Sequence, residues 1–217
     1  LDGNCYRDFN LGDLSTAAGF APTPIVEAIS QQALRGNHFL LPVEDSLVVS
    51  QLLGKRFGLP CWQYTLSASG AVADALRLAR ASTGRDLVLT FSGKYHGHLD
   101  EMLWSDDDPE GMGLARTSAK SSRTIPFNDL EALADALAAS PVAAVISEPV
   151  MTNCGLVLPE PTFHAELRRL AHDAGTLVIS DVTHTQFAVL GGGLDDFNVG
   201  PDIVVGGKGI GGGVPVG

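Results

Sequence analysis

Polar and ionisable residues follow the apolar runs of this sequence, at positions where their side chains could meet and do chemistry. They are Ser67 and Ser69, with Ala68 between them, after residues 61–66; Tyr95 and His96 after 86–91; Glu148 and Asn153 after 141–147; Asp181, Thr183 and His184 after 176–180; and Lys208 after 202–206. In open α/β sheets, ligands bind at the carboxyl ends of the strands. If the runs are parallel strands, one rim would carry hydroxyls, an aromatic ring, imidazoles, carboxylates and an amine.

The aspartate and the lysine carry the strongest chemical implications. Asp181 follows a mostly apolar run, where a carboxylate is costly unless a cation or a hydrogen-bond donor pairs with it. Lys208 also follows an apolar run, where a desolvated amine can act as a nucleophile. Both positions favour a functional role.

The other residues keep structural interpretations beside the functional ones. Hydroxyl residues ahead of a helix, such as Ser67 and Ser69, are most often N-caps, although the first-turn N–H groups also favour a bound phosphate. Tyr95 is by default a half-buried aromatic residue, and His96 and His184 are by default turn or loop residues. The residue types alone leave these alternatives open.

The glycine-rich stretch VVGGKGIGGGVPVG at residues 204–217 matches a weak nucleotide motif. Its glycines fit G-x-G-x-x-G from Gly207 through Gly209 to Gly212. A dinucleotide fingerprint follows the first strand of a βαβ unit and precedes a helix, whereas this stretch follows the last apolar run. The phosphate-loop pattern fails because Gly209 follows the lysine. Nucleotide binding is therefore disfavoured.

The elements that must position these residues are predicted from periodicity and end signals. Helices are expected at about 25–35, at 44–57, at 70–82, at 129–140 with Asn128 as the cap, and at 163–174. Strands are expected at 61–66, 86–91, 141–147, 176–180 and 202–206. This alternation predicts an α/β fold, a three-layer αβα arrangement with a mostly parallel central sheet.

The composition of the chain excludes several classes of protein. The 217 residues carry a formal net charge of −11 with scattered lysines and arginines, which argues against a nucleic-acid surface. Cys5, Cys61 and Cys154 lack disulfide or zinc spacing, so we expect no metal and a reducing cytoplasm. No apolar run approaches the roughly 20 residues that span a membrane. Residues 105–111 read as a solvated loop, and the chain, which begins at Leu1, is expected to be a fragment.

The sequence resembles the class III aminotransferases of fold type I, and within them the group around glutamate-1-semialdehyde aminomutase. The matching stretches are LDGNCYRDFNLGD, SASGAVADALRLARASTGRD, SGKYHGHLDEML, AAVISEPVMTNCGLVLPEPTFHAELRRLAHDAGTLVISD and PDIVVGGKGIGGGVPVG, in family order. The resemblance implies an aspartate-aminotransferase-like large domain at 36–217, truncated at its C-terminal end. It further implies an incomplete small domain that includes residues 1–35, a homodimer when full length, and an inactive isolated segment.

The resemblance also assigns roles around pyridoxal 5′-phosphate. Lys208 would form the Schiff base with the cofactor and move the substrate Cα proton, while Asp181 would keep the pyridine nitrogen protonated. The other residues assigned to the cofactor are Ser67, Ala68 and Ser69 at the phosphate, Tyr95 and Thr183 on the two ring faces, Asn153 at the 3′ oxygen, and His96 with Glu148 in support.

Three functional outcomes stay open. An aminotransferase, the function predicted, would move an amino group between an amino acid or amine and a keto acid or aldehyde. An aminomutase would return the amino group to the adjacent carbon of the same molecule, and SGKYHGHLDEML favours that group. A cofactor-binding domain without turnover would suit Val182, which stands where the family usually has glutamate.

Overall fold

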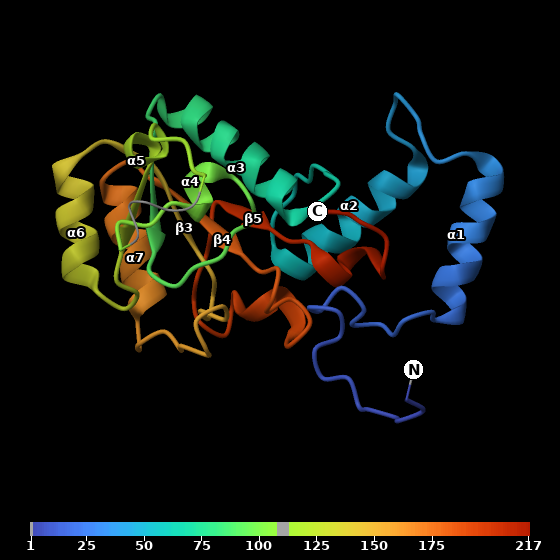
Figure 1. The fold of residues 1–217 in the computed structure, drawn as a ribbon. Coiled ribbons are helices and arrows are strands. Elements are labelled where there is room, and N and C mark those ends of the chain that lie inside the picture. Colours follow the sequence, from blue (N-terminus) through green and yellow to red (C-terminus); the bar gives the residue numbers. More distant parts are fainter. Residues whose placement is uncertain (1, 108–112) are drawn as a thin grey trace.

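A five-stranded parallel sheet forms the centre of the computed structural model, which describes residues 2–107 and 113–217 (Figure 1). The strands are β1 (Leu87–Phe91), β2 (Ser122–Ile125), β3 (Val142–Ser147), β4 (Leu177–Asp181) and β5 (Ile203–Val205). Their order across the sheet is β2-β1-β3-β4-β5, and every neighbouring pair is parallel. Their carboxyl ends therefore share one edge.

Helices precede, connect and cover these strands. The α-helices are α1 (Thr23–Arg35), α2 (Glu44–Phe57), α3 (Ala68–Thr83), α4 (Asp100–Leu103), α5 (Ser118–Ser121), α6 (Leu130–Ala139) and α7 (Phe163–Asp173). Two 3₁₀ helices follow, η1 (Leu190–Gly193) and η2 (Lys208–Gly211). No helix among the described residues is long and apolar enough to cross a membrane.

Alternate residues of the strands pack against helices on opposite faces of the sheet. Val88 and Ile146 belong to a buried cluster with residues of α3, whereas Leu89 and Val145 belong to a second cluster with residues of α6 and α7. This alternation is the two-residue period of a strand, and a parallel sheet needs both faces covered. The predicted three-layer α/β fold is confirmed.

One predicted strand is wrong. Residues 61–66 join none of the five described strands. Thr65 exchanges two backbone hydrogen bonds with Gly217, at 2.8 and 3.0 Å, while Trp62 and Tyr64 pack against a cluster that contains Phe57 of α2. The aromatic residues of this stretch are thus partly buried against a helix and not within the sheet.

The predicted cap of α6 is also wrong. The N-cap is Asp129, whose side chain accepts a hydrogen bond from the Ala132 N–H at 2.9 Å. Asn128 instead holds the loop before α7, because its amide donates to the Leu158 carbonyl and its oxygen accepts from the Glu160 N–H. Asparagine and aspartate both cap helices well, so residue type does not distinguish Asn128 from Asp129.

The acidic segment at 105–111 is only partly described, since residues 108–111 lie outside the described residues. Asp106 and Asp107 are exposed, as expected of a loop. Asp106 also accepts a hydrogen bond from the Thr124 N–H at 2.6 Å, and Asp107 accepts one from the Ser92 hydroxyl at 2.8 Å. The segment therefore binds the β2 edge of the sheet.

The N-terminal segment lies largely apart from the sheet. Helix α1 stands at the end of the molecule opposite α6 (Figure 1) and has no buried residue. Residues 12–15 nevertheless return toward the carboxyl edge of the sheet, where Asp13 contacts Lys208. The domain boundary at 35/36 stays a prediction.

Candidate functional site

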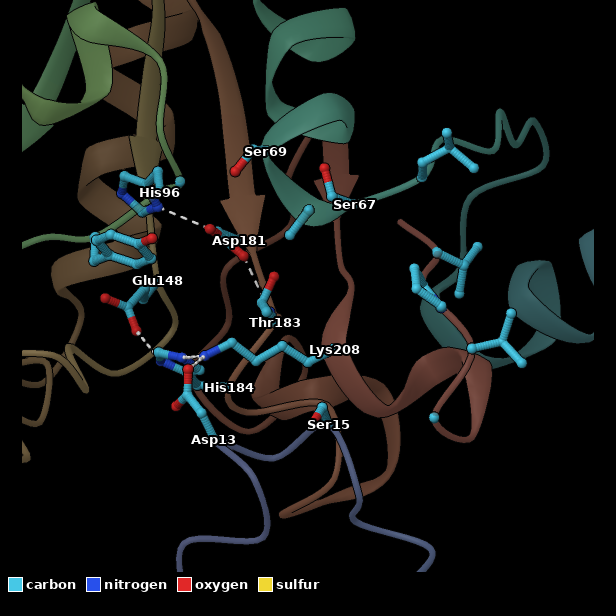
Figure 2. Close-up of a pocket in the computed structure, with 18 residues that line it drawn as sticks. Asp13, Ser15, Ser67, Ser69, His96, Glu148, Asp181, Thr183, His184 and Lys208 are labelled. Carbon is cyan, nitrogen blue, oxygen red and sulfur yellow. Dashed lines mark hydrogen bonds and ion pairs between the residues drawn. The ribbon is translucent and has the colours of Figure 1, made fainter. Parts of the chain in front are cut away.

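A cavity of about 460 Å³ lies at the carboxyl edge of the sheet. It is lined by Asp13 and Ser15 of the N-terminal segment; residues 66–69 at the start of α3; Tyr95, His96 and Gly97 after β1; Glu148 after β3; Asp181, Thr183 and His184 at the end of β4; Lys208 after β5; and residues 213–216. Figure 2 shows the polar side chains arranged around this space. Segments far apart in the chain thus supply one site.

Asp181 is a buried carboxylate at the floor of the cavity, with only 5% of its surface exposed. One oxygen accepts a hydrogen bond from His96 Nδ1 at 2.8 Å, and the other accepts one from the Thr183 N–H at 3.0 Å (Figure 2). Burial alone would raise the pKa of Asp181, but the hydrogen bond and charge of His96 and the hydrogen bond from the Thr183 N–H hold the pKa below its ordinary value. The carboxylate is therefore ionised.

Two polar atoms beside this carboxylate have no partner among the described residues. They are His96 Nε2 and the Thr183 hydroxyl, and both are buried. Buried polar atoms are normally hydrogen-bonded. Val182, between Asp181 and Thr183, points instead into an apolar cluster with Leu53 and is fully buried. The residue that replaces the family's usual glutamate is not among those lining the cavity.

Lys208 reaches the cavity from the other side. Its amine donates a hydrogen bond to Asp13 at 2.6 Å and contacts His184 Nε2. The bond from Lys208 lowers the pKa of Asp13. Lys208 also adopts a φ of +54°, in the left-handed region that non-glycine residues rarely occupy and that is often found at functional sites.

The N-terminus of α3 opens onto the cavity. Ser67 caps the helix by accepting a hydrogen bond from the Gly70 N–H at 3.1 Å, and Ala68 and Ser69 form the first turn. The free N–H groups of a helix start and its dipole attract phosphate groups. The hydroxyl of Ser69 accepts a hydrogen bond from the His98 N–H at 3.2 Å.

Two glycines bring the neighbouring loops close to this helix start. A Cβ at Gly97, which has a φ of +93°, would lie 2.3 Å from the Ser69 hydroxyl. A Cβ at Gly207 would lie 2.7 Å from the Ala68 Cβ. Since such contacts are too short for carbon, glycine is required at both positions, and the loops that carry His96 and Lys208 can approach α3.

Most of the predicted site residues, but not all of them, line the same cavity in the structure. Nine of the assigned residues, Ser67, Ala68, Ser69, Tyr95, His96, Glu148, Asp181, Thr183 and Lys208, line the cavity. Asn153 is exposed and is not among the described lining residues. Asp13 and Ser15 were not assigned to the site, and His184 was placed at the strand-end rim with a loop interpretation equally open. The roles of all these residues stay predictions.

Comparison with known proteins gives consistent matches. The family model described as Aminotransferase class-III matches residues 1–217. A glutamate-1-semialdehyde 2,1-aminomutase from Roseiflexus castenholzii is 39% identical over 226 residues, covering 99% of this chain and 52% of that protein. A glutamate-1-semialdehyde-aminomutase variant from Pseudomonas aeruginosa, solved in complex with PMP, matches with a TM-score of 0.89 at 42% identity, covering 97% and 48%.

The structure of a transaminase also matches this chain. An omega-transaminase from Sphaerobacter thermophilus matches with a TM-score of 0.89 at 30% identity, covering 96% of this chain and 51% of that one. The chain therefore spans about half the length of the relatives it matches.

Proposed function

Because this chain belongs to the class III aminotransferase family, we propose that it forms the cofactor-binding part of a pyridoxal-phosphate-dependent enzyme. That enzyme moves an amino group between an amino acid or amine and a keto acid or aldehyde. The observation that carries the proposal is the single cavity that brings together Lys208, the ionised Asp181 and the start of α3.

The residues present fit this cofactor. Its phosphate needs an anion cradle, which the first turn of α3 offers with Ser67 and Ser69. Its ring nitrogen needs an acidic partner, and the buried Asp181 carboxylate retains acceptor capacity beside two bonds. The buried Thr183 hydroxyl and His96 Nε2, which lack partners among the described residues, offer further polar contacts.

Each residue then has a task. Pyridoxal phosphate supplies an aldehyde that captures amines and a ring that accepts electron density from the substrate carbon. Lys208 would hold the cofactor through its amine and, once released, move the proton at the substrate Cα. Asp181 would keep the ring nitrogen protonated, because an ionised, buried carboxylate stabilises a facing N–H⁺. Tyr95 and Thr183 would orient the ring.

An aminomutase is the second candidate. It is favoured by the 39% identity to a glutamate-1-semialdehyde 2,1-aminomutase over nearly all of this chain. The two functions differ in one measurement: an aminomutase converts a single substrate without a keto-acid or aldehyde acceptor. A protein that binds the cofactor and does neither would be a binding domain without turnover.

The proposal is tested by trapping the lysine. Full-length protein is incubated with pyridoxal phosphate, reduced with borohydride and digested, and the modified peptide is mapped by mass spectrometry. We expect modification at Lys208, and its loss in Lys208→Arg.

Lys94 provides a matched control, because it is a second partly buried lysine after β1 whose pKa is lowered by burial. Its amine donates a hydrogen bond to the Trp104 carbonyl. Lys94→Arg should therefore leave the modification of Lys208 unchanged. Absence of modification, or modification centred on Lys94, would contradict the proposal.

A further inference from the structure

Asp13 places a carboxylate beside the amine of Lys208. Its Oδ2 accepts a hydrogen bond from that amine at 2.6 Å, and both side chains line the cavity (Figure 2). The hydrogen bond from Lys208 lowers the pKa of Asp13, so the carboxylate is ionised. The lysine side chain is 17% exposed, whereas that of Asp13 is 74% exposed. Most of the Asp13 side chain is therefore open to a ligand that enters the cavity.

The loop that carries Asp13 is held by its own hydrogen bonds. The Asp13 N–H donates to the Asn10 side chain at 2.8 Å, and the N–H and hydroxyl of Thr16 donate to the Leu11 carbonyl at 2.9 and 2.7 Å. Leu11, Asp13 and Leu14 have φ values of 56°, 55° and 64°, in the left-handed region that costs energy for such residues. Because bonds within the loop maintain this backbone, the carboxylate should stay in place when the lysine amine binds another group.

A close contact also fixes this loop against the turn that carries Lys208. A Cβ at Gly209 would lie 2.6 Å from the Leu14 carbonyl oxygen, which is too short for a carbon–oxygen contact. Glycine at 209 therefore allows the two segments to touch. Asp13 and Lys208 are the sequence neighbours of these two residues, so the packing keeps the carboxylate and the amine together.

Negative charge predominates among the described residues that line the cavity. Asp13, Glu148 and Asp181 are acidic, and Lys208 is the sole lysine or arginine among those residues. Asp181 accepts two hydrogen bonds from its neighbours, and Glu148 accepts two from Thr152. Asp13 differs from these two carboxylates because its partner is the amine proposed to act on the substrate.

We propose that Asp13 determines the class of amino donor: it favours amines without a carboxylate on the reacting carbon over α-amino acids. This inference rests on the proposed function, in which Lys208 moves the proton at that carbon. Reacting atoms lie roughly 3–3.5 Å apart, and each substituent of the carbon is one covalent bond further away. A carboxylate substituent would therefore lie near the charge of Asp13 and be repelled, whereas a hydrogen or an alkyl group would not.

The test compares two donors of nearly the same shape, isopropylamine and L-alanine, which differ by a methyl group in place of the carboxylate. Full-length, cofactor-loaded protein is mixed with each donor, and single-turnover rates are followed by the absorbance of the cofactor. Asp13→Asn should lower the preference for isopropylamine about fivefold, the size expected for partly exposed charges. The change should come mainly from faster reaction with alanine, a gain that a misfolded variant could not produce.

Binding of propionate gives a second measurement that needs no turnover and decides the question where a donor does not react. Its dissociation constant, measured by titration calorimetry on the cofactor-loaded protein, should fall about fivefold in Asp13→Asn, because a like charge is removed.

Asp8→Asn is the matched control. Asp8 is an exposed aspartate of the same segment outside the cavity lining. Its Oδ1 accepts hydrogen bonds from the N–H groups of Asn10 and Leu11, and asparagine keeps this acceptor. An unchanged donor preference or propionate affinity in Asp13→Asn, or equal changes in Asp8→Asn, would overturn the inference. Borohydride trapping at Lys208 judges the proposed function separately, since trapping with an unchanged preference rejects only the role of Asp13.

Discussion

Asp181 carries a negative charge where burial opposes it. The carboxylate ends a strand whose other residues are apolar except for Ser180, and donors from His96 and Thr183 make its ionised form stable. Burying a charge costs several kcal/mol unless such donors offset it. The hydrogen bonds that keep Asp181 ionised therefore prepare the site before any ligand arrives.

Replacing this carboxylate tests its contribution to both stability and chemistry. We expect Asp181→Asn to lower the free energy of unfolding by about 1.5–3 kcal/mol at pH 7, because a charge-assisted hydrogen bond is weakened. We also expect turnover to fall about 100-fold, as when one electrostatic partner of a transition state is lost. Urea unfolding and steady-state kinetics measure the two effects.

The pH dependence of this difference follows from the direction of the shift. The folded-state pKa of Asp181 lies below its ordinary value of 3.8, so the contribution is fully present above the unfolded pKa and is lost as the pH falls through the folded pKa. The difference in the free energy of unfolding between wild type and Asp181→Asn should therefore disappear only below about pH 4. Asp74→Asn, in an exposed pair with Arg77, should show almost no gap. A gap that stays constant to pH 2 would contradict this account.

The sequence indicates some of these residues better than others. Asp181 and Lys208 could be identified because a polar residue directly after an apolar strand stands at the ligand-binding edge of the sheet. Asp13 could not, since its contact with Lys208 joins residues 195 positions apart. No local pattern reports which distant loop will return to the cavity.

Helix α3 and the loop after β1 act as one unit around the anion cradle. Ser69 accepts a hydrogen bond from the backbone of His98, and Gly97 lies against Ser69 with no space for a side chain. The loop also carries His96, which bonds Asp181. A shift of the helix start would therefore move the partner of the buried carboxylate as well.

Comparison of two helix caps, Ser67 and Asp129, distinguishes the structural role of Ser67 from its proposed role in cofactor binding. Ser67→Ala and Asp129→Ala each remove a side chain that accepts a hydrogen bond from a first-turn N–H, so each should destabilise the protein by about 1 kcal/mol. Only Ser67→Ala should also weaken cofactor binding, because Ser67 lines the cavity whereas Asp129 does not. Chemical denaturation and equilibrium dialysis with pyridoxal phosphate measure the two effects. Equal losses of cofactor affinity in both variants would argue against the cradle.

The sequence predicts elements well where a helix buries one face or a strand buries both. Residues 44–57 and 141–147 follow such patterns closely, and their elements match α2 and β3 within one residue. Strand β2 was missed because Ser122–Ile125 is a short edge strand with a single large apolar residue. Residues 61–66 were wrongly predicted to be a strand, since Trp62 and Tyr64 pack against α2 and not within the sheet.

At the scale of the whole molecule, helices α1 and α2 lie on the side away from α6 (Figure 1), and they carry many exposed apolar side chains. The exposed residues on and between these helices include Val26, Ile29, Leu34, Leu40, Leu41, Leu47 and Leu52. Leu40 is 99% exposed and Leu34 is 90% exposed. Exposed apolar residues on neighbouring elements often mark an interface, and we propose that these residues join two copies of the full-length protein.

Replacing exposed leucines with lysines tests the proposed interface. Leu40→Lys combined with Leu47→Lys should raise the dimer dissociation constant about 100-fold or more, because each buried leucine contributes at least about 1.5 kcal/mol. Leu78→Lys is the control, since Leu78 is 56% exposed but lies on α3. Sedimentation equilibrium measures the three constants. A wild-type protein that is monomeric at micromolar concentration, or equal weakening by Leu78→Lys, would contradict the proposal.

The contact between Asp13 and Lys208 also constrains when the site can exist during synthesis. One partner leaves the ribosome near the beginning of this sequence and the other almost 200 residues later. At roughly 5–20 residues per second, tens of seconds can pass before the cavity has all its walls. Pairings between distant segments also form slowly. Cofactor capture must therefore follow translation of this region, and a ligand that binds only the folded chain then draws newly made protein toward that state.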